Sequence, residues 1–314
     1  MEKITKSPVE LAKERAQALN KNKPTGPTTA VGPAPMKRPQ VIGQAKLTDE
    51  QVAEIFKSLS GNYERKKGKN ANIFLAGDSG SGKTHLLKTM PGPIHIDSCD
   101  PDGLETLSEE IKSGLVIPDT RWELDNPKAP SMFKLWDEVF LQRLQSGYFN
   151  HIGTYVLDSL TTWADLLMNN IINEEKRPNT APQIQDYGLQ QVLAKTAVKM
   201  IAGLPCNCVI TAHLDTMKDD VSGKVMTSIM VPGKASVKLP LEFSELYVLE
   251  AVSSISPQGE KTSRTLLTRN TGKYRAKTRM GKNGLFDLRE PADLGALMRK
   301  AGLPTDNKPL MPGQ

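Results

Sequence analysis

NIFLAGDSGSGKT, residues Asn72–Thr84, is the segment that sets the fold of this 314-residue chain. A short apolar run leads into Gly77-x-x-x-x-Gly82-Lys83-Thr84, which is the complete P-loop pattern. Helix-forming residues follow directly from His85. The pattern therefore predicts a strand, a glycine-rich loop and a helix in succession.

The chemistry of a phosphate-binding loop accounts for this spacing. Glycines let successive backbone N–H groups turn inward around phosphate oxygens, and the following helix points the positive end of its dipole at the same anion. Lys83 would supply a mobile charge for the β- and γ-phosphates, and the Thr84 hydroxyl would ligate Mg²⁺. The alternative, a Gly/Ser-rich surface turn beside a lysine, does not explain the strand and helix context. The predicted nucleotide-binding residues are Gly77, Asp78, Ser79, Gly80, Ser81, Gly82, Lys83 and Thr84.

Length and composition suit one large domain with appendages, or two small domains. No run approaches the roughly 18 apolar residues of a membrane span, and the N-terminus lacks the apolar core of a signal peptide. The three cysteines, Cys99, Cys206 and Cys208, form no disulfide framework and are expected to be buried thiols. We therefore expect a protein of the cytoplasm that makes no membrane contact.

Positive charge is concentrated at the N-terminus. Residues 1–46 contain nine Lys/Arg and three acids, whereas the remainder contains 32 of each, so this arm accounts for the net charge of +6. Residues 21–44 are rich in Pro, Gly and Thr, which predicts a flexible linker. Two interpretations of the basic arm stay open: attraction to nucleic-acid phosphates, or a solubilising tail.

Apolar periodicity predicts the remaining elements. We expect helices over 8–20, 48–59, 131–145, 186–201 and 291–300, strands over 93–97, 154–159, 208–213, 244–251 and 262–268, and an exposed loop over 169–185.

Two of these strands end in polar residues. Asp158 follows an apolar strand in the Walker B pattern, where a carboxylate holds the Mg²⁺ shell, usually through water. Its alternative function is to cap a helix that starts at Ser159. His213 ends the strand over 208–213 and would either sense the γ-phosphate or serve a structural function.

A basic run follows the later strands. Between Lys261 and Lys282 there are eight basic residues and no acid, with Tyr274 among them. A solvated face is the usual explanation of such a run, but charge of a single sign on a neutral body favours contact with phosphates. The basic residues are Lys261, Arg264, Arg269, Lys273, Arg275, Lys277, Arg279 and Lys282.

Taken together, the P-loop, the strand ending in Asp158 and the strand ending in His213 resemble those of RecA-like P-loop ATPases. The chain looks most like the phage-encoded nucleotide-binding proteins that include single-strand annealing recombinases, over residues 68–285. Lys277-Thr278-Arg279-Met280-Gly281 is similar to the Lys-x-Arg-x-Gly segment of the RadA and DnaB families. The resemblance implies that Lys277 and Arg279 reach the γ-phosphate of a neighbouring subunit, and that the working form is a ring or a filament.

One feature departs from the family pattern. The family usually places a glutamate after the second strand as the base for the attacking water, whereas this chain has Asp97, Asp100 and Asp102 there. An aspartate is one methylene shorter, so we favour Asp100 as the base and expect slow hydrolysis.

The sequence thus predicts an α/β fold: a RecA-like P-loop NTPase core with a mainly parallel sheet flanked by helices and a C-terminal antiparallel β extension. Its expected parts are a flexible basic arm (1–46), the ATPase core (47–285) and a C-terminal helix and tail (286–314). The expected catalytic residues are Lys83, Asp100, Asp158, His213, Lys277 and Arg279, and Thr84 and Asp158 are the expected metal ligands.

The expected function is ATP and Mg²⁺ binding with slow, DNA-stimulated hydrolysis in phage-type recombination or replication, in the cytoplasm of a bacterial host. Single-stranded DNA would bind the loops after Asp158 and His213 of a homo-oligomer. The alternatives are a hexameric DNA helicase or translocase, and a nucleotide-gated scaffold with negligible hydrolysis.

Overall fold

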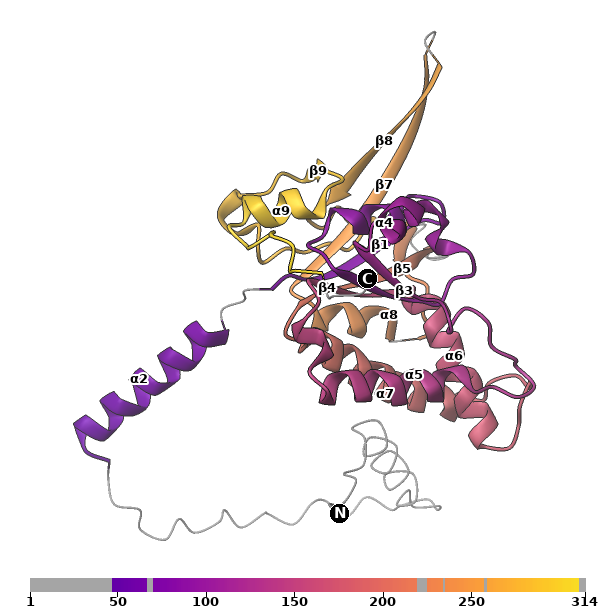
Figure 1. Ribbon diagram of the computed structural model, residues 1–314, viewed down its shortest axis with the longest axis horizontal. Helices are drawn as coiled ribbons and strands as arrows, with labels where there is room; N and C mark the ends of the chain where they lie inside the picture. The colour runs from indigo at the N-terminus through magenta and orange to yellow at the C-terminus, as the bar shows by residue number, and fades with distance from the viewer. Residues whose placement is uncertain (1–46, 67–69, 219–224, 234, 257–258, 311–314) are drawn as a thin grey trace. The chain divides into compact units, whose positions relative to one another are not determined.

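The structure, a computed structural model, describes residues 47–66, 70–218, 225–233, 235–256 and 259–310 (Figure 1). The predicted basic arm over 1–46, including its helix over 8–20, lies outside these residues. The described residues fall into two compact units, with α2 (Asp49–Lys66) in one and everything from Asn70 onward in the other.

The helix α2 starts at a capping box. The backbone N–H of Thr48 donates to Gln51 Oε1 over 3.0 Å, and that of Gln51 donates to Thr48 Oγ1 over 3.3 Å. The predicted helix over 48–59 is confirmed and continues to Lys66.

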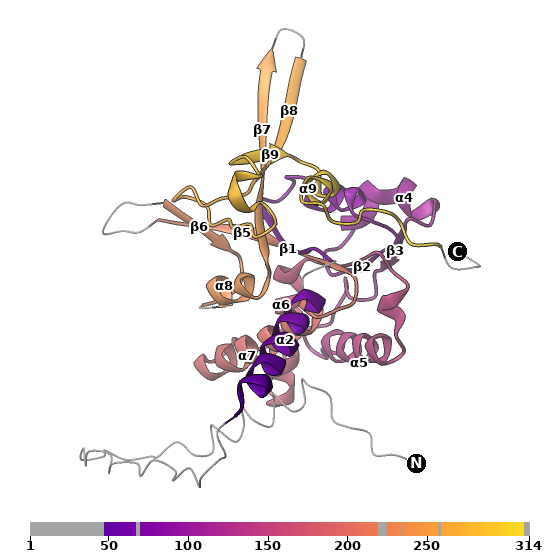
Figure 2. The same ribbon diagram turned by 90° about the vertical axis from the view of Figure 1, so that its left-hand side faces the viewer.

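The second unit is built on a mainly parallel sheet (Figures 1 and 2). Its strand order is β3-β2-β4-β5-β1-β7-β8-β9, and β6 pairs with β5 outside this path. The first six strands of that order run parallel, whereas β6, β8 and β9 pair antiparallel with their neighbours. The strands are β1 (Asn72–Gly77), β2 (Ile94–Ser98), β3 (Val116–Asp119), β4 (Thr154–Asp158), β5 (Asn207–Lys218), β6 (Val225–Ile229), β7 (Glu245–Ser256), β8 (Gly259–Leu267) and β9 (Arg289–Pro291).

The predicted parallel sheet with a C-terminal antiparallel extension is therefore confirmed. The sequence predictions missed β3, β6 and β9. They also ended the strand over 208–213 five residues early, because β5 continues to Lys218 through its pairing with β6. In both views β7 and β8 extend beyond the rest of the sheet as a two-stranded hairpin (Figures 1 and 2).

Helices flank both faces of the sheet. The prediction of an exposed loop over 169–185 is wrong for residues 169–174, because α6 continues to Glu174 and buries Ile171 and Ile172. No helix in the described ranges is both long and apolar enough to cross a membrane. The helices of this unit are α3 (Lys83–Leu86), α4 (Ser108–Lys112), α5 (Met132–Gln145), α6 (Leu160–Glu174), α7 (Ile184–Ala202), α8 (Ala235–Lys238) and α9 (Leu294–Lys300), with 3₁₀ turns η1 (Leu87–Thr89), η2 (Gly103–Leu107), η3 (Tyr148–Asn150), η4 (Leu239–Glu242) and η5 (Lys282–Gly284).

Alternation along β1 divides the apolar residues between two cores. Phe74 and Ala76 face the core formed with α5, α6 and α7, and Ile73 and Leu75 face the core that contains α9. Figures 1 and 2 show α5, α6 and α7 together on one face of the sheet, with α4 and α9 on the other. The C-terminal segment up to Lys300 thus belongs to this unit, and the predicted boundary at residue 285 falls before its last strand and helix.

Asp97 is the centre of a buried polar network at the carboxyl end of β2. The carboxylate is fully buried, and it accepts hydrogen bonds from the indole N–H groups of Trp122 and Trp136, from Tyr155 Oη and from Arg143. His95 Nε2 lies 3.0 Å from Asp97 Oδ1 as a further partner. Trp136 and Arg143 come from α5, Tyr155 from β4 and Trp122 from the segment after β3, so the network fixes β2 against α5 and β4.

The network also controls the ionisation of Asp97. Burial raises the pKa of this carboxyl, but the hydrogen bonds and charges of His95, Arg143 and Tyr155 outweigh burial and lower the pKa to about 2. Asp119 shares Arg143 through a 2.6 Å ion pair. Asp97 is therefore a structural carboxylate, which stabilises the fold.

We predict that Asp97→Asn lowers the free energy of unfolding by about 3–5 kcal/mol, because it removes the charge that several buried donors share. Urea denaturation at pH 7 measures this loss. Glu138→Gln, which breaks only the exposed Lys134–Glu138 pair, is the matched control and should cost less than about 1 kcal/mol.

The folded-state pKa of Asp97 lies below its ordinary value of 3.8, so its stabilising contribution is present above about pH 4 and is lost as pH falls toward 2. The difference in free energy of unfolding between wild type and Asp97→Asn should therefore become smaller as the pH falls from about 4 toward 2. A difference that stays constant from pH 7 to pH 2 would contradict the assignment.

Candidate nucleotide-binding site

Backbone geometry explains the glycines of the P-loop. The loop Asp78–Gly82 links β1 to α3, and Gly82 has a φ of 98°, in the left-handed region that favours glycine. A Cβ on Gly77 would come within 2.8 Å of Ser81 Oγ and 3.1 Å of the Leu249 carbonyl. The predicted helix after the loop is present but short, because α3 has four residues before it passes into η1. Its dipole therefore acts through a single turn.

The ammonium of Lys83 is held beside this loop. Lys83 Nζ donates to the carbonyls of Gly77 and Asp78 over 3.0 and 2.9 Å, and it lies 3.3 Å from Nδ1 of His213. Burial lowers the pKa of Lys83, and the negative charges of Asp158, Asp100 and Asp78 partly offset that effect.

Asp158 connects β4 to the neighbouring strand β5 and to the helix α3. Its carboxylate, at the end of β4, accepts a 2.7 Å hydrogen bond from Thr84 Oγ1 and another from the Thr211 hydroxyl of β5. The alternative of a helix cap is wrong, because Ser159 occupies the N-cap of α6 and Asp158 bonds elsewhere. Burial raises the pKa of Asp158, and the hydroxyls of Thr211 and Thr84 offset this only in part.

These contacts test whether the site suits a metal ion. Lys83 acts on Asp158 by its charge, but no Lys, Arg or His among the described residues lies within ion-pair distance of this buried carboxylate. Thr84 and Asp158 offer one hydroxyl and one carboxylate in contact with each other, which are the oxygen ligands that Mg²⁺ prefers. The two predicted ligands therefore fit the ion.

Asp100 and His213 form a second polar group at the cavity. Asp100 Oδ1 accepts hydrogen bonds from the hydroxyls of Ser159 (2.9 Å) and Thr162, and Oδ2 lies 3.2 Å from His213 Nε2. Burial raises the pKa of Asp100, but the hydrogen bonds from His213, Thr162 and Ser159 outweigh it, so the net pKa is lowered. Asp100 is therefore ionised at neutral pH.

His213 bridges this carboxylate to Lys83. With the proton on Nε2, the neutral ring donates to Asp100 and its Nδ1 accepts from the Lys83 ammonium, so both observed contacts are satisfied by one tautomer. Among the described residues, the ring of His213 therefore contacts two groups, the Lys83 ammonium and the Asp100 carboxylate.

A cavity of about 550 Å³ lies among these groups, within the usual range for small-molecule sites. Asp100 lines it, whereas Asp97 belongs to the buried network and Asp102 is exposed outside the lining. The sequence-predicted residues that line it are Ser79, Gly80, Gly82, Lys83, Thr84, Asp100, Asp158 and His213.

Arg264 of β8 also lines this cavity, although sequence analysis counted it only as one member of the basic run. Its Nε donates to the carbonyl of Ser81 over 2.9 Å. Arg264 and Ser81 are 183 residues apart, so no local pattern in the sequence links them. The one signal in the sequence was the position of Arg264 in the basic run over 261–282.

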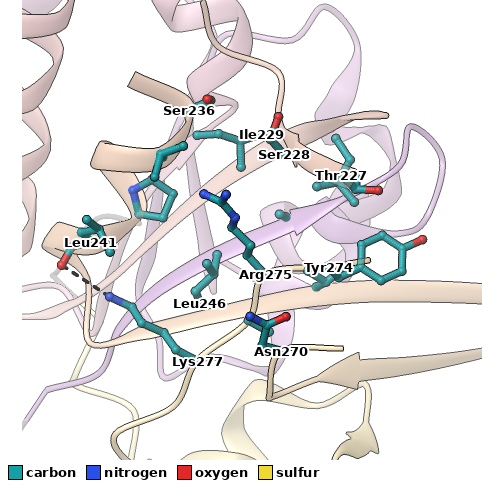
Figure 3. Close-up of a pocket in the computed structure, with 16 residues that line it drawn as sticks. Thr227, Ser228, Ile229, Ser236, Leu241, Leu246, Asn270, Tyr274, Arg275 and Lys277 are labelled. Atoms are coloured by element: carbon teal, nitrogen blue, oxygen red, sulfur yellow. Dashed lines mark hydrogen bonds between the residues drawn. The ribbon is translucent and has the colours of Figure 1, made fainter. Parts of the chain in front are cut away.

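Lys277 and Arg279 lie elsewhere in their own chain. Lys277 Nζ donates to the carbonyl of Leu241 over 3.4 Å, and the residue lines a separate, mainly apolar cavity of about 180 Å³ (Figure 3). Buried Glu245 holds the segment by accepting from the backbone N–H groups of Arg279 and Met280. Neither cation lines the P-loop cavity of the same chain.

Comparisons with known proteins support a family assignment. A family model described as an AAA domain matches residues 69–280, which is more than half of the chain. No curated protein matches the sequence.

Two solved structures share parts of the architecture. One is the flagellar accessory protein FlaH from Methanocaldococcus jannaschii, at 13% identity and a TM-score of 0.34, over 70% of this chain and 86% of FlaH. The other is a prototypical ATPase from the type III secretion system of pathogenic bacteria, at 15% identity and a TM-score of 0.35, over 57% of this chain and 51% of that ATPase. Both are too distant to bear on function.

The family match spans the P-loop, Asp158 and His213, on a parallel sheet with the predicted RecA-like arrangement. This chain belongs to the AAA domain family, and its P-loop lies on a mainly parallel sheet flanked by helices.

Proposed function

We propose that the protein binds ATP and Mg²⁺ and hydrolyses ATP slowly as an oligomeric ring or filament on single-stranded DNA. Its biological function would be single-strand annealing or strand pairing in phage-type recombination or replication. The observation that carries the proposal is the set of contacts in which Asp158 bonds Thr84 and His213 bridges Lys83 to Asp100, all around one cavity.

The P-loop residues bind and orient the nucleotide. The backbone N–H groups of the loop and the Lys83 ammonium would hold the β- and γ-phosphates, and Thr84 and Asp158 would hold Mg²⁺. When bound, the ion neutralises phosphate charge. Asp158 needs no large movement for this, because it already contacts Thr84.

Asp100 is the residue placed to accept a proton from the attacking water. Its lowered pKa keeps it ionised but makes it a weak base. Ser159, Thr162 and His213 already occupy three of the roughly four lone-pair positions of a carboxylate. A water must therefore take the remaining position or displace a partner, which supports slow turnover.

The positions of Lys277 and Arg279 support an assembled working form. Both cations lie outside the P-loop cavity of their own chain, and Glu245 fixes the backbone that carries them. A rigid cationic segment of this kind would reach a neighbour's γ-phosphate only when the subunits are correctly assembled.

Exposed cations support contact with a nucleic-acid backbone. Seven of the eight basic residues between Lys261 and Lys282 are exposed, and Lys277 is half-buried. No loop directly follows Asp158 or His213, because α6 begins at Leu160 and β5 continues to Lys218. We propose instead that the arm over 1–46 and the members of the basic run other than Arg264, Lys277 and Arg279 contact DNA.

The hydrogen bonds of Asp100 also favour a second candidate, a nucleotide-gated scaffold with negligible hydrolysis. If His213 and the two hydroxyls keep Asp100 occupied, ATP binding alone would order the oligomer. Turnover measurements distinguish the two functions.

Turnover with and without single-stranded DNA is the main test. We expect slow ATP hydrolysis that single-stranded DNA stimulates, with a larger mass in solution when ATP is present. Because the log of DNA affinity falls with log salt by about 0.7 for each phosphate contact on a single strand, we expect a slope steeper than about −2. A flat salt dependence would remove the basic run and the arm from the interface.

We predict that Lys83→Ala raises the Kd for ATP by roughly 10- to 100-fold, because a charged hydrogen-bond donor to the phosphates is lost. Isothermal titration calorimetry measures the change. Lys88→Ala, whose side chain pairs with Glu110 outside the cavity, is the matched control and should bind ATP normally. Unchanged ATP binding by Lys83→Ala would defeat the P-loop assignment.

We predict that Lys277→Ala keeps ATP affinity within about threefold of wild type while hydrolysis falls roughly 10³-fold, because the neighbour's cation is lost from the transition state. Lys308→Ala, whose side chain bonds the Asn150 carbonyl away from both cavities, is the control and should keep its turnover.

A mixture of Lys277→Ala and Lys83→Ala subunits tests whether Lys277 acts across an interface. In a randomly assembled equal mixture, roughly a quarter of the interfaces would join an intact Lys83 in one subunit to an intact Lys277 in the next, so activity should reappear on mixing. Equal loss of binding and hydrolysis in Lys277→Ala, with no recovery on mixing, would place Lys277 in its own subunit's fold.

A further inference from the structure

Arg264 is the one cation from the antiparallel extension that lines the P-loop cavity in the described part of the chain. It lies on β8, and Nε donates to the Ser81 carbonyl over 2.9 Å. The contact is close, because a Cβ on Gly82 would come within 2.9 Å of the same Nε. The side chain is exposed, but this contact holds it at the rim of the loop.

The order of the strands places Arg264 away from the terminal phosphate. Asp158 ends β4, and His213 lies on β5, on one side of β1 in the sheet, whereas β7 and β8 lie on the other side. Asp100 joins the first group through His213. The groups that surround a γ-phosphate and its metal are therefore gathered on the side of the P-loop opposite to Arg264.

The atom that Arg264 contacts also argues against phosphate binding. A phosphate lies on the inner side of a P-loop, where the backbone N–H groups converge, but Arg264 bonds a carbonyl oxygen. With Nε engaged, the two terminal nitrogens of the guanidinium have no hydrogen-bond partner among the described contacts. A planar guanidinium fixed at one edge in this way suits stacking on an aromatic ring.

We propose that Arg264 binds the nucleoside part of the nucleotide, with its guanidinium against the base. The inference rests on the proposed function, because it requires a nucleoside phosphate in the P-loop. It assigns to β8 a part in nucleotide binding that is separate from the phosphate ligands.

Three ligands with Mg²⁺ test this assignment by calorimetry: ATP, ADP and inorganic tripolyphosphate. We expect Arg264→Ala to weaken ATP and ADP binding by the same factor, roughly tenfold, and to leave tripolyphosphate binding unchanged. Arg264→Lys should lose nearly as much, because it keeps the charge without the plane. Arg299→Ala is the matched control, since Arg299 pairs with Asp293 on α9 outside the cavity.

The contrary outcomes are distinct. Equal weakening of tripolyphosphate would mean that Arg264 only supports the P-loop, and a greater loss for ATP than for ADP would place it at the terminal phosphate. Either result, or unchanged affinity for all three ligands, overturns the proposal. Failure of the wild-type chain to bind ATP, ADP or tripolyphosphate would instead refute the proposed function.

Discussion

The carboxylate of Asp158 accepts hydroxyl hydrogen bonds from the first turn after the P-loop and from Thr211 of β5. These contacts require the carboxyl ends of β1 and β4 to lie beside the middle of β5, and the parallel register supplies that alignment. Gly77 pairs with His213, and Leu157 pairs with Ile210. The cavity therefore forms where β1 and β4 end on either side of β5, which continues to Lys218.

β5 lies between the P-loop strand and β4, and two of its polar residues contact different neighbours. Thr211 bonds Asp158, whereas His213, two residues further on the same face, contacts Lys83 and Asp100. The period of two along a strand thus puts both side chains on the side of the cavity. The result is a connected set of polar contacts that joins the P-loop to the loop after β2.

Three aspartates follow the second strand, but their surroundings differ. Asp97 is enclosed by indole, phenol, imidazole and guanidinium donors, and Asp100 bonds two hydroxyls and His213. Asp102 is exposed. A buried carboxylate with so many donors stabilises the fold, whereas one that borders a cavity is free to meet a ligand. Burial therefore separates the structural aspartate from the candidate base.

Local patterns in the sequence were enough to identify the P-loop, the strand that ends in Asp158, the strand that carries His213 and the amphipathic helix over 186–201. Each depends on residues that are near one another in the chain, where glycine geometry and apolar periodicity act directly. The strand β3, the continuation of α6 to Glu174, the separation of Asp97 from Asp100 and the place of Arg264 were beyond such patterns. They follow from strand order and from contacts between distant segments, such as the 183 residues that separate Ser81 from Arg264. No periodicity encodes which strands become neighbours, because that choice depends on how the two apolar faces of the sheet are buried together.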